Sequence, residues 1–173
     1  KLDSIISEYI YAHEESTLQE VTGRILKSNG WTVSCAESCT GGNIAAMLSS
    51  VPGASAYFMG SVTSYAVGVK ENVLKVPAEL IEKHGVVSEE VAIAMAEGVR
   101  VLTNSDFAVA TTGVAGPGDS DGVPEGTVCI GFASAKESKA IVLRYRHDRN
   151  HNIQRFTASA LNFLRSSILE YCK

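Results

Sequence analysis

The chain has 173 residues, and its 15 lysines and arginines against 19 aspartates and glutamates give a formal net charge of -4. This balance argues against a general nucleic-acid binder, which normally carries a basic face. An apolar fraction of 45% can fill a hydrophobic core, so the composition excludes intrinsic disorder as the main state.

The chain is expected to be a cytoplasmic protein that forms one domain over residues 1–173. No segment approaches the roughly 18 consecutive apolar residues that a membrane span needs. The first residues include Asp3 and Glu8, whereas a signal peptide requires an uninterrupted apolar stretch. Small α/β enzymes often form symmetric oligomers, so a homo-oligomer is an open option for this chain.

Helical spacing of apolar residues predicts a helical segment over residues 3–29, interrupted near 14–16 and packed on the same domain. Ser16-Thr17-Leu18-Gln19 has the form of a capping box, and Asn29-Gly30 is a typical helix end. Strands and helices then alternate: a strand at 31–36, a helix at 43–48, a strand at 58–66, and short helices at 70–75 and 78–84.

The second half begins with Ser88-Glu89-Glu90, a good N-cap followed by acids that favour the helix dipole. The elements expected after this helix are a strand at 106–112, strands at 126–135 and 139–145 joined by a polar turn, and a helix over 153–171. This order predicts an α/β fold, a layered α/β/α sandwich whose sheet is mixed and mostly parallel.

Three glycine-rich elements, at residues 37–42, 111–118 and 124–127, follow or precede predicted strands. Ligands of open α/β sheets bind where loops leave the carboxyl ends of strands. The first element would place Ser38 at an exposed turn beside helix N–H groups, which suit a phosphate or an oxyanion. An ordinary capped turn explains it equally well. The glycine spacing of the second element is not a dinucleotide fingerprint, and no P-loop exists.

A nucleophilic serine needs a base, and the four histidines offer no good triad. Lys70 is the available substitute if burial lowers its pKa, and Tyr65 could hold or relay a proton beside it. By spacing alone, a solvated lysine is the simpler reading. Arg149 could bind a phosphate with its forked guanidinium, or form a surface ion pair with Asp148.

No metal site or cofactor is expected. His147 and His151 could share a helical face, but no further ligand motif accompanies them, and a solvated surface is the preferred reading. Asp119 and Asp121 lie in a loop without the further carboxylates of a calcium site. The four cysteines form no CxxC pair, so reduced thiols are expected.

Taken together, these elements resemble the CinA C-terminal domain family, several of whose members are nicotinamide mononucleotide (NMN) amidohydrolases. The order and separation of the motifs agree from about residue 18 to 170. The family's motifs appear here as Ala36-Glu37-Ser38-Cys39-Thr40-Gly41-Gly42, as Tyr65 and Lys70 five residues apart, as Thr112 to Gly118, as Pro124 to Val128, and as Asp148-Arg149.

The resemblance implies hydrolysis of the carboxamide of NMN to nicotinic acid mononucleotide and ammonia, without metal or cofactor. It implies that Ser38 is the nucleophile, Lys70 the general base and Tyr65 its partner. The positions that the motifs imply for substrate binding are Glu37, Thr40, Gly41, Gly42, Thr112, Gly113, Ala115, Gly116 and Arg149. The implied partner is therefore a small nucleotide, with neither nucleic acid nor membrane. Cys39 is a rival nucleophile by its chemistry alone.

The chain departs from the common family pattern at three places. Residues 66–69 read Ala-Val-Gly-Val where many members have Ser-Asn-Glu-Ala, Val123 replaces a common lysine, and His147 replaces a common glycine. These changes bear on substrate affinity and phosphate binding more than on the Ser–Lys pair. A non-catalytic pyridine-nucleotide-binding or interaction domain is the alternative function. A DNA-associated competence role rests on the family's name alone, and the acidic net charge speaks against it.

Overall fold

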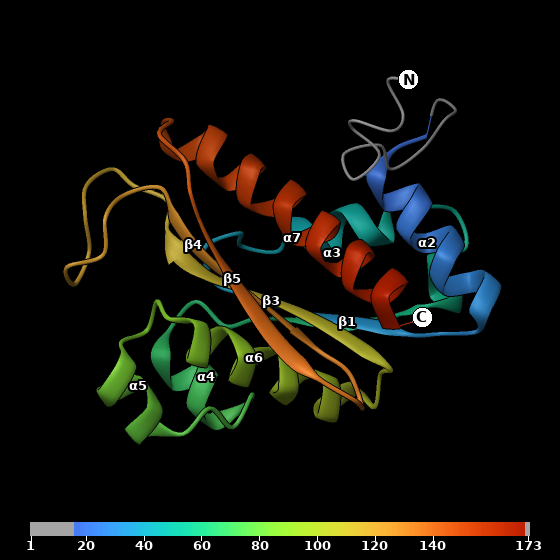
Figure 1. The fold of residues 1–173 in the computed structure, drawn as a ribbon, viewed down its shortest axis with the longest axis horizontal. Coiled ribbons are helices and arrows are strands. Elements are labelled where there is room, and N and C mark those ends of the chain that lie inside the picture. The colour runs from blue at the N-terminus through green and yellow to red at the C-terminus, as the bar shows by residue number, and fades with distance from the viewer. Residues whose placement is uncertain (1–15, 172–173) are drawn as a thin grey trace.

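A five-stranded sheet forms the centre of the computed structural model, which describes residues 16–171 (Figure 1). The strands are β1 (Val33–Glu37), β2 (Phe58–Thr63), β3 (Phe107–Val114), β4 (Thr127–Ala133) and β5 (Ser138–Arg144), in the spatial order β2-β1-β3-β4-β5. β1 pairs in parallel with β2 and β3, whereas the β3–β4 and β4–β5 pairs are antiparallel. β4 alone therefore runs against the other four strands, which confirms the mixed, mostly parallel sheet.

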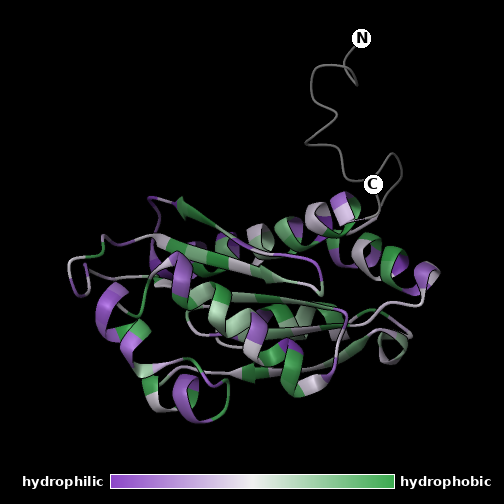
Figure 2. Cartoon of the chain, turned by 60° about the horizontal axis from the view of Figure 1, so that its bottom comes forward, coloured by the Kyte–Doolittle hydropathy of each residue, from purple (hydrophilic) through white to green (hydrophobic). Residues whose placement is uncertain are grey.

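Helices cover both faces of this sheet (Figure 1). One face carries α2 (Leu18–Asn29), α3 (Asn43–Ser49) and α7 (Arg149–Tyr171), and the other carries α4 (Val67–Asn72), α5 (Ala78–His84) and α6 (Glu89–Thr103). A short 3₁₀ turn, η1 (Ala54–Ala56), precedes β2. In Figure 2 the strands are largely green and the helices alternate between purple and green, as expected for amphipathic helices on an apolar sheet. The predicted α/β/α layering is confirmed.

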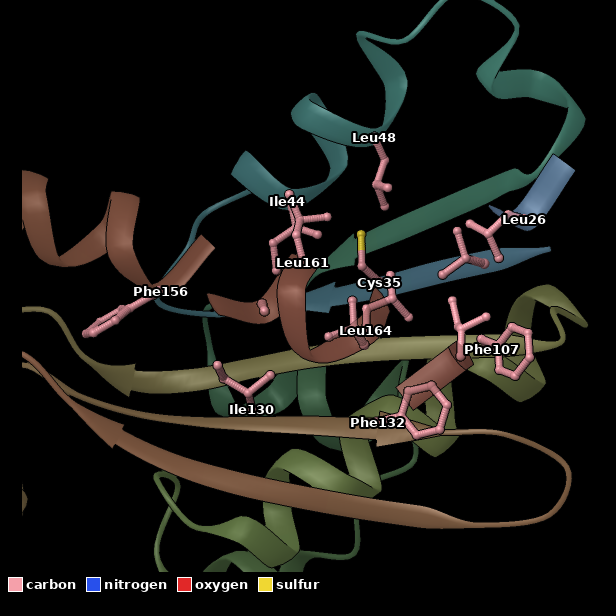
Figure 3. Packing of buried hydrophobic residues seen from close by; sticks show 14 of the residues in the cluster. Leu26, Cys35, Ile44, Leu48, Phe107, Ile130, Phe132, Phe156, Leu161 and Leu164 are labelled. Carbon is pink, nitrogen blue, oxygen red and sulfur yellow. The ribbon is translucent and has the colours of Figure 1, made fainter. Parts of the chain in front are cut away.

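β1 is buried along its whole length because helices cover both of its faces. Its Cys35 packs with Leu161 and Leu164 of α7 in one apolar cluster, seen in Figure 3, while Ala36 belongs to a second cluster beneath α6. Each fully buried leucine of this kind contributes about 1.5–3 kcal/mol to folding. The helices on both faces of the sheet therefore hold β1, the strand that ends directly before Ser38, firmly in place.

Two glycines allow α6 to lie close to its neighbours. A Cβ on Gly98 would lie 2.0 Å from the carbonyl oxygen of Leu74, and one on Gly131 would lie 2.2 Å from that of Ala92. Neither backbone could give way without moving a packed element. α6 thus sits directly against β4 and against the segment that follows α4.

Some boundaries differ from those the sequence predicts. The capping box of α2 lies one residue later than expected, since the Thr17 hydroxyl accepts from the Glu20 amide at 3.4 Å and the Glu20 carboxylate accepts from the Thr17 amide at 2.7 Å. α7 begins at Arg149 rather than at 153, because the Asp148 carboxylate accepts from the first amides of the helix. The part of the predicted first helix that covers residues 3–15 lies outside the described residues. Within 16–171, no helix combines the length and apolar content required to cross a membrane.

Candidate active site

Ser38 lies on the turn that follows β1. Its amide donates to the Thr111 carbonyl of β3 at 3.0 Å, which extends the parallel ladder by one residue and fixes the backbone at Ser38. Gly41 and Gly42 then take positive φ angles of 64° and 107°, which glycine adopts at little cost, and α3 follows at once. The carboxyl ends of β1 and β3 thus hold Ser38 at the edge of the sheet, where open α/β folds bind ligands.

Lys70 lies on α4, the helix that follows the neighbouring strand β2, and its side chain contacts Ser38. Its Nζ lies 3.2 Å from Ser38 Oγ, and it donates to the carbonyl oxygens of Ser64 at 2.6 Å and of Tyr65 at 3.4 Å. The lysine side chain is fully buried. A solvated lysine, the simpler sequence-based reading, is therefore wrong.

Burial changes the acid–base chemistry of Lys70. Desolvation disfavours the ammonium form and lowers the pKa of this lysine, although a neighbouring Cys39 charge would act the other way. No carboxylate among residues 16–171 forms an ion pair with it to offset that effect. The arrangement raises the fraction of neutral amine that could accept a proton from Ser38.

Arg149, the first residue of α7, crosses to the same region. Its Nη1 donates to the Gly116 carbonyl at 2.5 Å and its Nη2 to the Tyr65 hydroxyl at 3.2 Å. The alternative ion pair with Asp148 is not formed, because that carboxylate caps α7 and bonds His151 Nδ1 at 2.5 Å. Arg149 is therefore free of its sequence neighbour and directed toward the Ser38 region.

The Tyr65 side chain binds a different partner from the one that the sequence suggests. Its phenol is largely exposed and pairs with Arg149, while only its backbone carbonyl contacts Lys70. The expected proton relay through the phenol beside Lys70 is thus replaced by a backbone contact. The phenol instead joins the segment after β2 to the start of α7.

The end of β3 and the loop that follows it form the opposite wall of the site. The hydroxyl of Thr112 is buried and donates to the Val86 carbonyl at 2.8 Å. A Cβ on Gly113 would lie 2.5 Å from the Thr127 carbonyl oxygen, so no larger residue fits there. Behind the loop, the buried Asn152 of α7 donates through Nδ2 to the Ala115 carbonyl at 3.0 Å.

These parts enclose a cavity of about 470 Å³, a size suited to a small molecule. Its charged lining consists of Arg149 and two carboxylates. The full lining is Ser38, Cys39, Tyr65, Val86, Val87, Thr112 to Ser120, Asp121 and Arg149. Seven of the expected site residues therefore meet at one cavity: Ser38, Tyr65, Thr112, Gly113, Ala115, Gly116 and Arg149.

Four other expected substrate contacts lie behind the turn and outside that lining. Thr40 shares a 2.8 Å hydrogen bond between its Oγ1 and that of Thr111, and Gly41 and Gly42 shape the bend. The carboxylate of Glu37 accepts from three amides at the start of α3. The helix N–H groups that the sequence suggests for a phosphate or an oxyanion are thus already occupied by this side chain.

Cys39, the rival nucleophile, also lines the cavity but is only 6% exposed. Desolvation raises the pKa of its thiol to about 12. A thiol of that acidity holds almost no thiolate near neutral pH, and the thiolate is the reactive form. The environment therefore favours Ser38 over Cys39. Cys35, Cys39 and Cys129 are all free thiols, as expected.

Two of the residues considered as metal ligands, His151 and Asp119, form hydrogen bonds within the protein. His151 pairs with Asp148, and the Asp119 carboxylate accepts from the Glu125 amide at 2.8 Å. Across residues 16–171, no three His, Cys, Asp or Glu side chains gather as a metal site would require.

Sequence reasoning missed two positions that support the site. Ser64 contributes a carbonyl oxygen, which no side-chain motif reports. Asn152 is fully buried on α7, next to the apolar series that begins with Ile153. An asparagine beside such a series is a weak signal, and only the fold shows that it reaches Ala115.

Residues 15–168 match the family model described as the CinA C-terminal domain. The chain belongs to this family. A putative competence-damage inducible protein of Desulforudis audaxviator is 45% identical over 139 residues, which cover 80% of this chain and 34% of the relative. A CinA-like protein of Sulfurihydrogenibium sp. is 45% identical over 166 residues, 95% of this chain and 42% of the relative. The chain thus spans well under half the length of these curated CinA relatives.

Solved CinA structures share the fold of this CinA-family chain. A competence-damaged protein (CinA) superfamily protein from Klebsiella pneumoniae has a TM-score of 0.84 at 32% identity, covering 90% of this chain and 99% of that one. A competence/damage inducible protein, CihA, from Agrobacterium tumefaciens has a TM-score of 0.79 at 32% identity, with 90% and 98% covered. The family resemblance seen in the sequence is confirmed, while none of these four names states a reaction.

Proposed function

We propose that this domain is an amidohydrolase that removes ammonia from the carboxamide of NMN, with Ser38 as nucleophile and Lys70 as general base. The observation that carries the proposal is the 3.2 Å contact between Lys70 Nζ and Ser38 Oγ at the wall of the cavity. Such a distance permits direct proton transfer, and the lowered pKa of the lysine supplies the neutral amine that a base needs.

In the first half of the proposed reaction, neutral Lys70 accepts the proton of the Ser38 hydroxyl as Oγ attacks the amide carbon. The backbone N–H groups from Gly113 to Gly116, at the end of β3 and the start of the loop after it, are the proposed donors to the developing oxyanion. The carbon–nitrogen bond then breaks, and the Lys70 ammonium returns its proton to the departing nitrogen. Ammonia leaves, and the acyl group remains as an ester on Ser38.

In the second half, a water molecule attacks the ester while Lys70 takes a proton from it. The carbon–oxygen bond to Ser38 breaks, the serine recovers its proton from Lys70, and the carboxylic acid is released. One lysine thus serves both halves, acting in turn as base and acid. Every proton in this cycle moves between Ser38, Lys70, water and the leaving nitrogen.

Arg149 is the proposed contact for the phosphate of NMN. It is the one cationic side chain in the lining of the cavity, and a guanidinium binds phosphate through paired N–H groups. Its bonds to Gly116 and Tyr65 hold the side chain in place before substrate arrives. An arginine held in this way loses little side-chain entropy on binding.

One observation favours a second candidate, a pyridine-nucleotide-binding domain without turnover. The two carbonyl oxygens that accept from Lys70 stabilise its ammonium form, which cannot act as a base. Burial acts against this effect and lowers the pKa overall. Which state dominates at working pH decides between catalysis and binding alone.

The test is ammonia release from NMN by the purified protein, with and without a metal chelator. NAD and free nicotinamide serve as comparison amides, since neither presents the same mononucleotide phosphate. The proposal expects turnover of NMN that the chelator leaves unchanged. Binding of NMN in calorimetry with no ammonia release would support the second candidate and contradict the first.

A further inference from the structure

The carboxylate of Glu37 ties the end of β1 to the start of α3. Oε2 accepts from the amides of Gly42 and Ile44, each at 3.0 Å, and Oε1 accepts from the amide of Ala45 at 2.9 Å. The side chain is fully buried, and it does not line the cavity. Three hydrogen bonds from one buried carboxylate hold the helix start rigidly, because each amide would otherwise lack a partner.

The five residues between β1 and α3, Ser38 to Gly42, are the catalytic turn. Two glycines with positive φ make this segment flexible in the absence of other restraints. The hydrogen bonds of the Glu37 carboxylate join the two ends of this turn, because Glu37 is the last residue of β1 and the amides that it binds are at the start of α3. The Thr111 carbonyl holds the Ser38 end of the turn, and the Glu37 carboxylate restrains the end that leads into α3.

The backbone of Glu37 also restrains Lys70, through Ser64. Its carbonyl accepts from the Ser64 amide at 2.7 Å, and the Ser64 carbonyl in turn accepts from Lys70 Nζ at 2.6 Å. The side chain of Glu37 thus restrains the catalytic turn, and its main-chain carbonyl restrains Ser64, whose own carbonyl accepts from Lys70. The residues of the main-chain connection, Glu37, Ser64 and Lys70, are fully buried.

We infer that Glu37 is a positioning residue, which holds Ser38 Oγ within proton-transfer distance of Lys70 Nζ and contacts neither substrate nor lysine. This inference rests on the proposed role of Ser38 and Lys70. It predicts a loss in kcat rather than in substrate affinity, since only the alignment of the pair changes. A displacement of about 1 Å between reacting groups can cost about 100-fold in rate.

The first test compares Glu37→Gln with Glu20→Gln. Glu20 is the matched control, because its carboxylate also caps a helix, accepting from the Thr17 amide and hydroxyl, but it lies at an exposed position at the start of α2. Glutamine cannot accept all three amides of α3, so kcat for NMN is expected to fall by about tenfold to 100-fold while KM stays within about threefold. Glu20→Gln should leave both constants unchanged. A raised KM with normal kcat would overturn the inference in favour of a substrate contact.

The second test needs no substrate. A fluorophosphonate reacts with an activated serine, and its second-order rate on Ser38 is measured well below the unfolding midpoint of each variant. The rate should fall by about tenfold or more in Glu37→Gln and stay normal in Glu20→Gln. An equal rate in folded Glu37→Gln would overturn the inference, as would no labelling of the wild type.

This design separates the inference from the proposed function. If the wild type reacts with the probe but does not hydrolyse NMN, the substrate proposal fails while the probe rates still decide the role of Glu37. If Glu37→Gln does not fold, Glu37→Asp takes its place, since it keeps the carboxylate but shortens its reach by one methylene. A normal probe rate in Glu37→Asp would contradict the requirement for exact positioning, and a slow one would support it.

Discussion

Lys70 Nζ lies 3.2 Å from Ser38 Oγ, although 32 residues separate the two in the chain. The parallel pairing of β1 with β2 creates this contact, because the segments that follow two adjacent parallel strands emerge at the same edge of the sheet. The turn after β1 carries the serine, and the connection after β2 leads into the helix that carries the lysine. The candidate chemistry is thus a direct product of the topology.

The pH dependence of turnover should follow Lys70. Burial lowers the pKa of this lysine below its ordinary value of 10.5, and only the neutral amine can accept the Ser38 proton. kcat/KM for NMN should therefore rise with pH through the lowered pKa and level off above it. Lys70→Arg, which stays protonated, should lose about 100-fold or more across the whole range. A flat profile in the wild type, or an active arginine variant, would remove Lys70 from the role of base.

Arg149→Ala should weaken substrate binding more than chemistry. The guanidinium is proposed to meet the phosphate, so its loss should raise KM for NMN by about 10-fold to 100-fold, the cost of one charged hydrogen-bonded contact. The matched control is Arg155→Ala, on the exposed side of the same helix. Steady-state kinetics of both variants give the answer, and an unchanged KM in Arg149→Ala would place the phosphate elsewhere.

Gly113→Ala should destabilise the protein and reduce activity. The new methyl group would lie 2.5 Å from the Thr127 carbonyl oxygen, so β3 and β4 must separate locally. Overpacking of this kind costs about 1–3 kcal/mol. Gly68→Ala is the control, since its Cβ would meet only the Asn72 side chain, at 3.6 Å. Denaturant unfolding of both variants should show the loss in Gly113→Ala alone, and equal stabilities would contradict the close approach.

Cys39→Ala should keep most of the wild-type turnover. The thiol pKa of about 12 leaves almost no thiolate to act as a nucleophile near neutral pH. The same burial should make the wild type resistant to iodoacetamide at pH 7, as followed by residual ammonia release. Rapid inactivation that NMN prevents, together with loss of turnover in Cys39→Ala, would make the cysteine rather than the serine the reactive group.

Much of the architecture follows from local signals in the sequence. Ser88 and the acids after it predict α6, and the structure shows the Ser88 hydroxyl accepting from the Val91 amide at 3.3 Å. Gly30 ends α2 with a φ of 67°, as Asn29-Gly30 predicts. These signals work because each depends on residues within one turn of the helix end.

The geometry of the site could not be predicted from local sequence patterns, because it depends on how the strands and helices pack together. The sequence brings Ser38 and Lys70 together only through a family resemblance, since no local rule predicts which strands are neighbours. Tyr65 shows the same limit, because its side chain turns to Arg149, 84 residues away, while its carbonyl serves Lys70. Glu37 belongs to a motif that suggests a substrate contact, yet its carboxylate faces α3. Side-chain direction depends on packing between elements, which a linear pattern does not encode.

The most direct test of the central claim is ammonia release from NMN by Ser38→Ala and Lys70→Ala beside the wild type, with circular dichroism showing that each variant is folded. The account predicts steady turnover by the wild type and none above background in Ser38→Ala, because Ser38 is the hydroxyl of the cavity lining that Lys70 Nζ contacts, at 3.2 Å. Lys70→Ala should lose at least about 100-fold, the usual share of a general base. Undiminished turnover in folded Ser38→Ala would contradict the account.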